Sequence, residues 1–303
     1  MYVEMKQEFH TPVMVREVLE YLQPVPGKII VDATAGTGGH SSVIAEHLMP
    51  FGKLLCIDRD KESLLIAKER LAAFHDICDF VHGNFSSIDQ ILREKNINAV
   101  DGILLDIGIS SFQLDNPERG FSFQNAGPLD MRMDRTSSIS AFDLVNNLNE
   151  EEISHLLRVF GQERWHNRIA RLVVSEREKH PISTTEELND IVMRAIPYHQ
   201  KMRHYRIHPA TRTFQAVRIA VNRELEALES SLRKIVDYLN PGARICVISF
   251  HSLEDRIVKL QFRSWAAEHK IKILTPKPLI PLASECVVNP RSRSAKFRAA
   301  EKI

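Results

Sequence analysis

The 303-residue sequence has no long hydrophobic run and few cysteines. Without a stretch of 18 apolar residues, and with acidic and basic residues mixed at the N-terminus, neither a transmembrane helix nor a signal peptide is expected. The cysteines form no C-x-x-C pair and show no zinc-type spacing with the 13 histidines; they are Cys56, Cys78, Cys246 and Cys286. We therefore expect a cytoplasmic protein with free thiols, no metal and no membrane partner.

The sequence also lacks an excess of charge of either sign, because its formal net charge is +1. Overall charge therefore identifies no partner, and any basic surface must be local. A hydrophobic content of 44% and a charged content of 26% are ordinary for a globular protein. A chain of this length is expected to form one or two domains with a substantial core.

The most informative stretch is 29–40, where an apolar strand pattern ends in Asp32 and continues into a glycine-rich turn and a helical pattern. Glycine has no Cβ and tolerates positive φ, so such a turn lets a ligand approach the backbone. A second strand pattern, 53–58, also ends in an acid. Asp58 lies about twenty residues beyond the turn, where a carboxylate can accept hydrogen bonds from ribose hydroxyls. The two features together favour a nucleoside-bearing cofactor over a ligand-free turn.

Two common nucleotide motifs are missing from this stretch. The dinucleotide fingerprint needs a third glycine where this sequence has Ser41, and no G-x-x-x-x-G-K-[ST] string occurs. S-adenosylmethionine has a ribose and an adenine but no phosphate, and it makes little demand on a third glycine. It is therefore the cofactor that the pattern favours.

Strand and helix patterns alternate up to about residue 112, which predicts a parallel sheet with helices on both faces. Strands are expected at 29–32, 53–58, 78–82, 100–106 and, later, 244–250. Ligands bind at the carboxyl ends of such strands, and Asp32, Asp58, Phe85 and Asp106 fall there. We expect an α/β Rossmann-like core, residues 1–112 and 214–303, interrupted by a mostly helical insertion at 113–213 that recognises the substrate.

Seven blocks of sequence, in order, carry a resemblance to a known family. They are residues 32–41, 103–111, 118–123, 127–133, 208–215, 249–256 and 289–294. In these blocks the chain resembles the bacterial 16S rRNA (cytosine-N4)-methyltransferases, known as the RsmH or MraW family. The resemblance spans nearly the whole chain. It implies a class I methyltransferase fold, S-adenosylmethionine as cofactor, and cytosine 1402 of 16S rRNA, at the decoding centre of the small ribosomal subunit, as substrate.

The resemblance also implies a set of cofactor-binding positions: Gly38, Gly39, His40, Asp58, Phe85, Asp106 and Gln113. The Gly38–Gly39 backbone would approach the methionine part of the cofactor, and Asp58 would accept from the ribose. Phe85 would pack on the adenine face, although a core aromatic fits its position nearly as well. Gln113 lies just beyond the fourth strand, where a polar side chain can reach the cofactor.

The implied reaction places demands on the residues after the fourth strand. A cytosine amine is a poor nucleophile, so it must be aligned with the methyl group while its N–H groups donate to an acceptor. Many amino-methyltransferases use an acid or amide followed by Pro-Pro-aromatic; residues 106–111 keep only the acid, which leaves the base-stacking partner unidentified. Asp106 is the candidate amine acceptor, or it serves the cofactor only. His251, after the fifth strand, is expected either to contact the substrate or to pack against the protein. Ser252, with Asp255 three residues later, predicts the N-cap of a helix.

Two basic clusters stand out against the neutral background. The first, at 198–212, contains Lys201, Arg203, Arg206 and Arg212, and the second, a C-terminal tail at 291–302, contains Arg291 and Arg293. Basic runs with interleaved aromatics suit single-stranded RNA, although short charge runs are also common on solvated surfaces. A DNA amino-methyltransferase and a non-catalytic RNA-binding ribosome-assembly factor are the alternatives, and a homodimer is left open.

Overall fold

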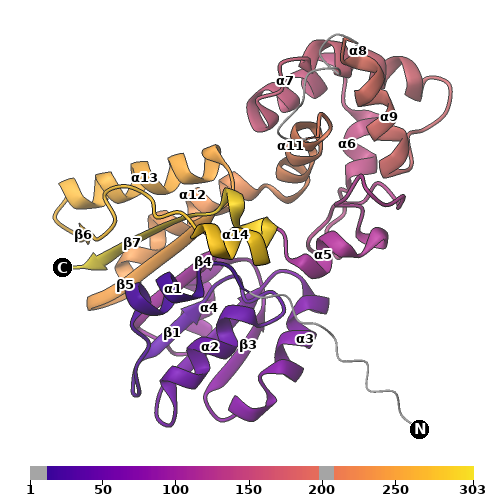
Figure 1. The fold of residues 1–303 in the computed structure, drawn as a ribbon. Coiled ribbons are helices and arrows are strands. Elements are labelled where there is room, and N and C mark those ends of the chain that lie inside the picture. Colours follow the sequence, from indigo (N-terminus) through magenta and orange to yellow (C-terminus); the bar gives the residue numbers. More distant parts are fainter. Residues whose placement is uncertain (1–11, 198–207) are drawn as a thin grey trace, which may run out of the picture. The chain divides into compact units, whose positions relative to one another are not determined.

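The computed structural model describes residues 12–197 and 208–303, which divide into two units (Figure 1). Unit 1 contains the residues up to Gly108 together with Leu225–Ile303, and unit 2 is Ile109–Glu224. The boundaries expected from the sequence were 112/113 and 213/214. The units meet instead at 108/109 and 224/225, so the helix α11 (Thr211–Asn222) belongs to unit 2.

The described part of unit 1 contains a seven-stranded sheet of order β3-β2-β1-β4-β5-β7-β6. The strands are β1 (Ile29–Asp32), β2 (Lys53–Asp58), β3 (Cys78–His82), β4 (Val100–Asp106), β5 (Leu239–Ser249), β6 (Ile271–Ile273) and β7 (Lys296–Lys302). The first five are parallel, and β7 is antiparallel to β5 and β6. The predicted Rossmann-like α/β class is confirmed, with the strand order reversing beside β1.

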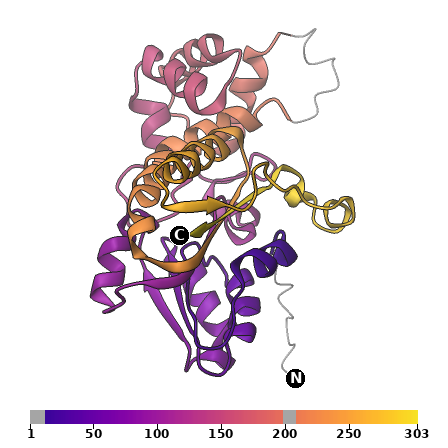
Figure 2. The same ribbon diagram turned by 90° about the vertical axis from the view of Figure 1, so that its left-hand side faces the viewer.

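Helices cover both faces of this sheet (Figures 1 and 2). In unit 1 they are α1 (Val15–Leu22), α2 (Gly39–Leu48), α3 (Lys61–Arg70), α4 (Ile88–Glu94), α12 (Glu224–Ile235), α13 (Ser252–Ala267) and α14 (Ala283–Val288). Successive residues of one strand pack in different hydrophobic clusters. Ile30 packs in a cluster with residues of α1, α2 and α3, and Val31 packs in a cluster with residues of α4, α12 and α13. Burial on both faces explains the continuous apolar runs in the sequence.

The C-terminal segment corrects one expectation. Lys296–Lys302 was expected to be part of a basic tail, but it forms β7, inside the sheet between β5 and β6. Phe297 and Ala299 are fully buried, and Arg298 is only 5% exposed because its Nε donates to Asp255 Oδ1 at 2.6 Å. The tail prediction is therefore wrong for these seven residues.

Unit 2 is helical around its own apolar core. Its helices are α5 (Ser111–Asp115), α6 (Ala141–Asn147), α7 (Glu150–Gly161), α8 (His166–Arg177), α9 (Thr185–Ala195) and α11. Capping boxes begin α6, α7 and α9, in which Ser140, Asn149 and Thr184 each accept from the backbone three residues later. Within the described ranges of both units, the helices are too short or too polar to cross a membrane.

Candidate active site

The turn after β1 is anchored to the ends of the neighbouring strands. Ala33 N donates to Leu104 O and Ala35 N to Ile57 O, each at 2.9 Å. Gly38 then begins α2 with φ 81°, and a Cβ there would lie 3.2 Å from the Ala67 Cα. Positive φ and this close approach to α3 both require glycine. The turn is therefore fixed to the ends of β2 and β4 and to α3.

Asp58, at the end of β2, holds the turn by its carboxylate. Oδ2 accepts from Gly36 N and Oδ1 from Asp60 N, each at 2.7 Å. Burial raises the pKa of Asp58 from 3.8 to about 6, although these two backbone donors act in the opposite direction. Each carboxylate oxygen has two lone pairs, so each can accept from one further donor. A pair of ribose hydroxyls would supply two such donors.

Asp32, at the end of β1, is buried and hydrogen-bonds within the turn and to α2. It is 1% exposed; Oδ2 accepts from Ser41 Oγ at 2.6 Å and Oδ1 from Thr34 N at 3.2 Å. Burial raises the pKa of its carboxyl group. The Thr34 hydroxyl in turn accepts from Asp106 N at 2.6 Å, so the turn fixes the backbone of β4 as well. Thr34 and Ser41 were not singled out as functional side chains; two hydroxyl residues beside a buried acid are the signal that could have found them.

His40 and Asp106 meet at the same edge of the sheet. His40 Nε2 lies 3.3 Å from Asp106 Oδ2, and the two side chains are 6% and 24% exposed. Within the described residues, neither ring nitrogen nor Asp106 Oδ1 makes a hydrogen bond of good geometry, although these atoms are buried. Buried polar atoms are nearly always paired in native proteins, so a set of unpaired ones indicates a binding position.

The other predicted side chains beside this edge have structural partners. Phe85 is 7% exposed and packs in the core with α4, which is the packing role that the sequence left open. His251 is the N-cap of α13: its ring accepts from Glu254 N at 3.4 Å, and Nε2 lies 3.0 Å from Glu254 Oε1. Within the described residues, His251 Nε2 and Glu254 Oε1 make no hydrogen bond of good geometry, so the cap role of His251 leaves its predicted contact with the substrate open. The expected Ser252 cap is wrong by one residue, because Asp255 pairs with Arg298.

The remaining predicted residues are spread over both units. Gln113 is 4% exposed in unit 2 and forms a capping box with Ser110 at the start of α5. Arg212 is exposed at the start of α11, and Arg291 and Arg293 are exposed in unit 1 on the short 3-10 turn Pro290–Ser294. Three predicted RNA contacts, Lys201, Arg203 and Arg206, lie outside the described residues.

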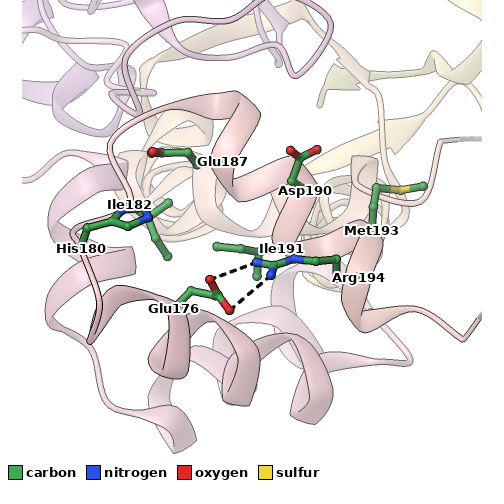
Figure 3. A pocket seen from close by; sticks show the side chains of 8 residues that line it. All are labelled: Glu176, His180, Ile182, Glu187, Asp190, Ile191, Met193 and Arg194. Atoms are coloured by element: carbon green, nitrogen blue, oxygen red, sulfur yellow. Dashed lines mark hydrogen bonds and ion pairs between the residues drawn. The ribbon is translucent and has the colours of Figure 1, made fainter.

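A hollow of about 520 Å³ lies elsewhere, between α8 and α9 of unit 2 (Figure 3). Its lining residues are Glu176, His180, Ile182, Glu187, Asp190, Ile191, Met193 and Arg194. Glu176 is engaged by Lys179 and Arg194, and Glu187 accepts from the backbone at the start of α9. None of the predicted site residues lines this hollow, so we do not assign it to the site.

Comparisons with known proteins place this geometry in a family context. The model of the MraW methylase family matches residues 7–303. Ribosomal RNA small subunit methyltransferase H of Pelobacter propionicus is 48% identical over 310 residues, covering 97% of this chain and 98% of that protein. The protein of the same name from Halothermothrix orenii is 45% identical over 309 residues, with coverage of 97% and 98%.

Solved structures are more distant. The crystal structure of fibrillarin from Aeropyrum pernix, in complex with S-adenosyl-L-methionine, aligns with a TM-score of 0.43 and 9% identity. The alignment covers 94% of this chain and 71% of that one. The strand order of β1 to β7, and not this likeness, therefore defines the fold.

Proposed function

This chain belongs to the MraW methylase family, and from that membership we propose that it methylates N4 of cytosine 1402 in 16S rRNA, using S-adenosylmethionine. The relatives that span its length are small-subunit rRNA methyltransferases by name. The observation that carries the proposal is the edge formed by the turn after β1, Asp58 and the His40–Asp106 pair. That edge combines a glycine-rich turn anchored to the strand ends, acceptors for a ribose on Asp58, and buried polar atoms of His40 and Asp106 without a hydrogen-bond partner among the described residues.

The chemistry of this edge fits S-adenosylmethionine. When bound, this cofactor supplies an electrophilic methyl group on a positively charged sulfonium. Asp32, Asp58 and Asp106 end three neighbouring strands, so the edge favours a cation. We propose that the backbone of Gly38 and Gly39 receives the methionine part and that Asp58 accepts from the ribose. His40 and Phe85 complete the proposed cofactor set in unit 1; Gln113, in unit 2, stays a prediction from the family resemblance.

Asp106 is the proposed acceptor for the reacting amine. Methylation would form a bond from N4 to the methyl carbon while the bond from that carbon to the sulfonium sulfur breaks, and N4 would give up one proton to a neighbouring acceptor. Asp106 Oδ1 is buried and has no hydrogen-bond partner among the described residues, which supports its accepting an N–H of the amine. His40, beside Oδ2, would hold the carboxylate in orientation. His251 caps α13 through Nδ1, and we keep its contact with the substrate as a prediction without assigning it a step.

Methyl transfer to small ribosomal subunits from a strain that lacks the enzyme tests the proposal. We expect one labelled methyl group per subunit, mapped to N4 of the target cytosine, and its loss in the Asp106→Asn variant. Labelling of DNA in place of subunits would favour the DNA-methyltransferase alternative. Subunit binding without labelling would favour a ribosome-assembly factor. The cytoplasm is the proposed compartment, and sedimentation of the pure protein would test the homodimer.

A further inference from the structure

The turn between α7 and α8 gathers exposed arginines around a tryptophan. Trp165 is half-buried at the start of α8, with the Arg164 and Arg168 guanidinium carbons 5.2 Å and 5.8 Å from its ring centroid. Both arginines are exposed. At these distances the guanidinium groups interact with the indole ring, so the three side chains form one surface.

The backbone of this turn is fixed from inside unit 2. Glu163 is 5% exposed, and its Oε1 accepts from Trp165 N at 2.8 Å. The acid of the turn therefore faces the protein, whereas the arginines face the solvent.

Helix α11 adds a third arginine. Gly161, the last residue of α7, lies so close to α11 that a Cβ there would stand 2.6 Å from Arg212 O. Arg212 reaches back over this contact, and its Nη1 donates to Gln162 O at 3.2 Å. The arginine surface is thus Arg164, Trp165, Arg168 and Arg212, drawn from α8, α11 and the turn that precedes α8, all within unit 2.

The chemistry of the arginine surface matches single-stranded nucleic acid. A planar guanidinium binds phosphate through two parallel hydrogen bonds, whereas an ammonium group offers only a point charge. An aromatic ring offers a face on which a base stacks irrespective of its sequence. The Trp165 ring and the guanidinium groups of Arg164 and Arg168 are close enough to contact neighbouring parts of one strand.

We propose that the arginine surface binds a single-stranded segment of the rRNA substrate, with its arginines on phosphates and Trp165 against a base. This proposal rests on the proposed function and adds Arg164, Trp165 and Arg168 to the RNA contacts expected from the sequence. It gives unit 2 a substrate-binding surface built from described residues.

The test measures binding of the full chain to a labelled single-stranded oligoribonucleotide carrying the target sequence, over a range of salt concentrations. For Arg164→Gln with Arg168→Gln, we expect the log–log salt slope to fall by about 1.4, since each phosphate contact on a single strand contributes about 0.7. The matched control is Lys28→Gln with Lys53→Gln, which removes the same charge at the opposite, amino-terminal edge of the sheet. The control should keep the wild-type affinity and slope.

Trp165→Leu separates stacking from charge, because leucine keeps the apolar packing and removes the ring. Stacking of one base corresponds to a loss of about 5-fold to 150-fold in affinity. The loss should vanish on an oligonucleotide that is abasic throughout. Affinity for S-adenosylhomocysteine and the midpoint of thermal unfolding report folding in every variant. If Trp165→Leu does not fold, the double variant Arg164→Gln, Arg168→Gln still tests whether the arginine surface binds RNA.

Wild-type affinity and salt slope in the arginine double variant would overturn the proposal. Equal losses for Trp165→Leu on normal and abasic strands would overturn the stacking part. If the variants bind the oligonucleotide normally but methylate assembled subunits slowly, the surface contacts a ribosomal protein instead, which also overturns the proposal. In each case normal methyl transfer by the wild-type protein shows that the proposed function stands, whereas its absence shows that the proposed function has failed.

Discussion

Asp58 meets two opposed demands at the end of β2. Its carboxylate is needed as an acceptor for Gly36 and Asp60, yet burial raises its pKa to about 6, with the charges of Asp60 and Asp32 adding to the effect. A ligand that donates two hydroxyl hydrogen bonds stabilises the ionised form. Binding of such a ligand and loss of the Asp58 proton are therefore linked.

This linkage predicts the pH dependence of cofactor affinity. Above pH 6 the Asp58 carboxylate is ionised before binding, so affinity should be constant; below pH 6 binding must expel a proton, and affinity should fall by up to tenfold per pH unit. Calorimetry with S-adenosylhomocysteine between pH 5 and 7 measures this. In Asp58→Ala the pH step should disappear and affinity should drop by about 1.5–3 kcal/mol. A wild-type affinity that is flat across this range would remove Asp58 from the ribose site.

Asp106 offers a second test at the residue scale. If its carboxylate accepts from the amine, the interaction strengthens in the transition state, and Asp106→Asn should lower kcat more than cofactor affinity. Single-turnover methylation and calorimetry give the two values. His40→Asn is the companion variant: it should lower kcat less than Asp106→Asn does, because His40 acts through Asp106. Equal losses of turnover and cofactor affinity in Asp106→Asn would assign Asp106 to the cofactor alone.

A helix or strand could be predicted from the sequence where its pattern of apolar residues lies within the element itself. The strands β1, β2 and β4 are buried on both faces, so their apolar runs were visible in the sequence, and β5 was found from residue 244 onward. The edge strand β3 has no buried residue, and only its short run of Phe80 and Val81 indicated it. By contrast, β6 has three residues, and β7 mixes Lys, Arg and Glu with small alanines. Its pairing depends on β5 and β6, which no local pattern reports.

The residues of the candidate site could likewise be predicted where local patterns indicate them, whereas their contacts could not. The strand-end acids follow from local patterns, but the contact of His40 with Asp106 depends on α2 and β4 meeting across β1. The engagement of His251 as a helix cap depends on one fully buried acid, Glu254. Composition gives no sign of which acid is buried, so the partners of these side chains had to come from the structure.

The strand role of β7 leads to a stability prediction. Arg298 and Asp255 have side chains that are 7% and 15% exposed, and their bond joins β7 to α13. Arg298→Ala should lower the free energy of unfolding by about 3 kcal/mol, since among the described residues Asp255 then keeps only the ion pair with Lys296 at 3.6 Å. Replacing both partners, as Arg298→Met with Asp255→Leu, should recover most of the loss. Urea unfolding measures both, and an Arg298→Ala variant with wild-type stability would return this segment to the role of a solvated tail.

At the scale of the whole molecule, a net charge of +1 means that RNA affinity must come from local clusters. The run at 198–212 is a basic cluster without an acid, and although its first ten residues lie outside the described ranges, its charges can be tested directly. Neutralising Lys201, Arg203 and Arg206 together should weaken oligoribonucleotide binding and reduce the log–log salt slope by about two. Affinity for S-adenosylhomocysteine should stay unchanged, because the strand-end edge that we propose for the cofactor lies in unit 1. The Lys28→Gln, Lys53→Gln control should leave both quantities at their wild-type values. If the triple variant matches the wild type in affinity and slope, the 198–212 run is solvated surface, and the arginine surface of unit 2 must hold the RNA without it.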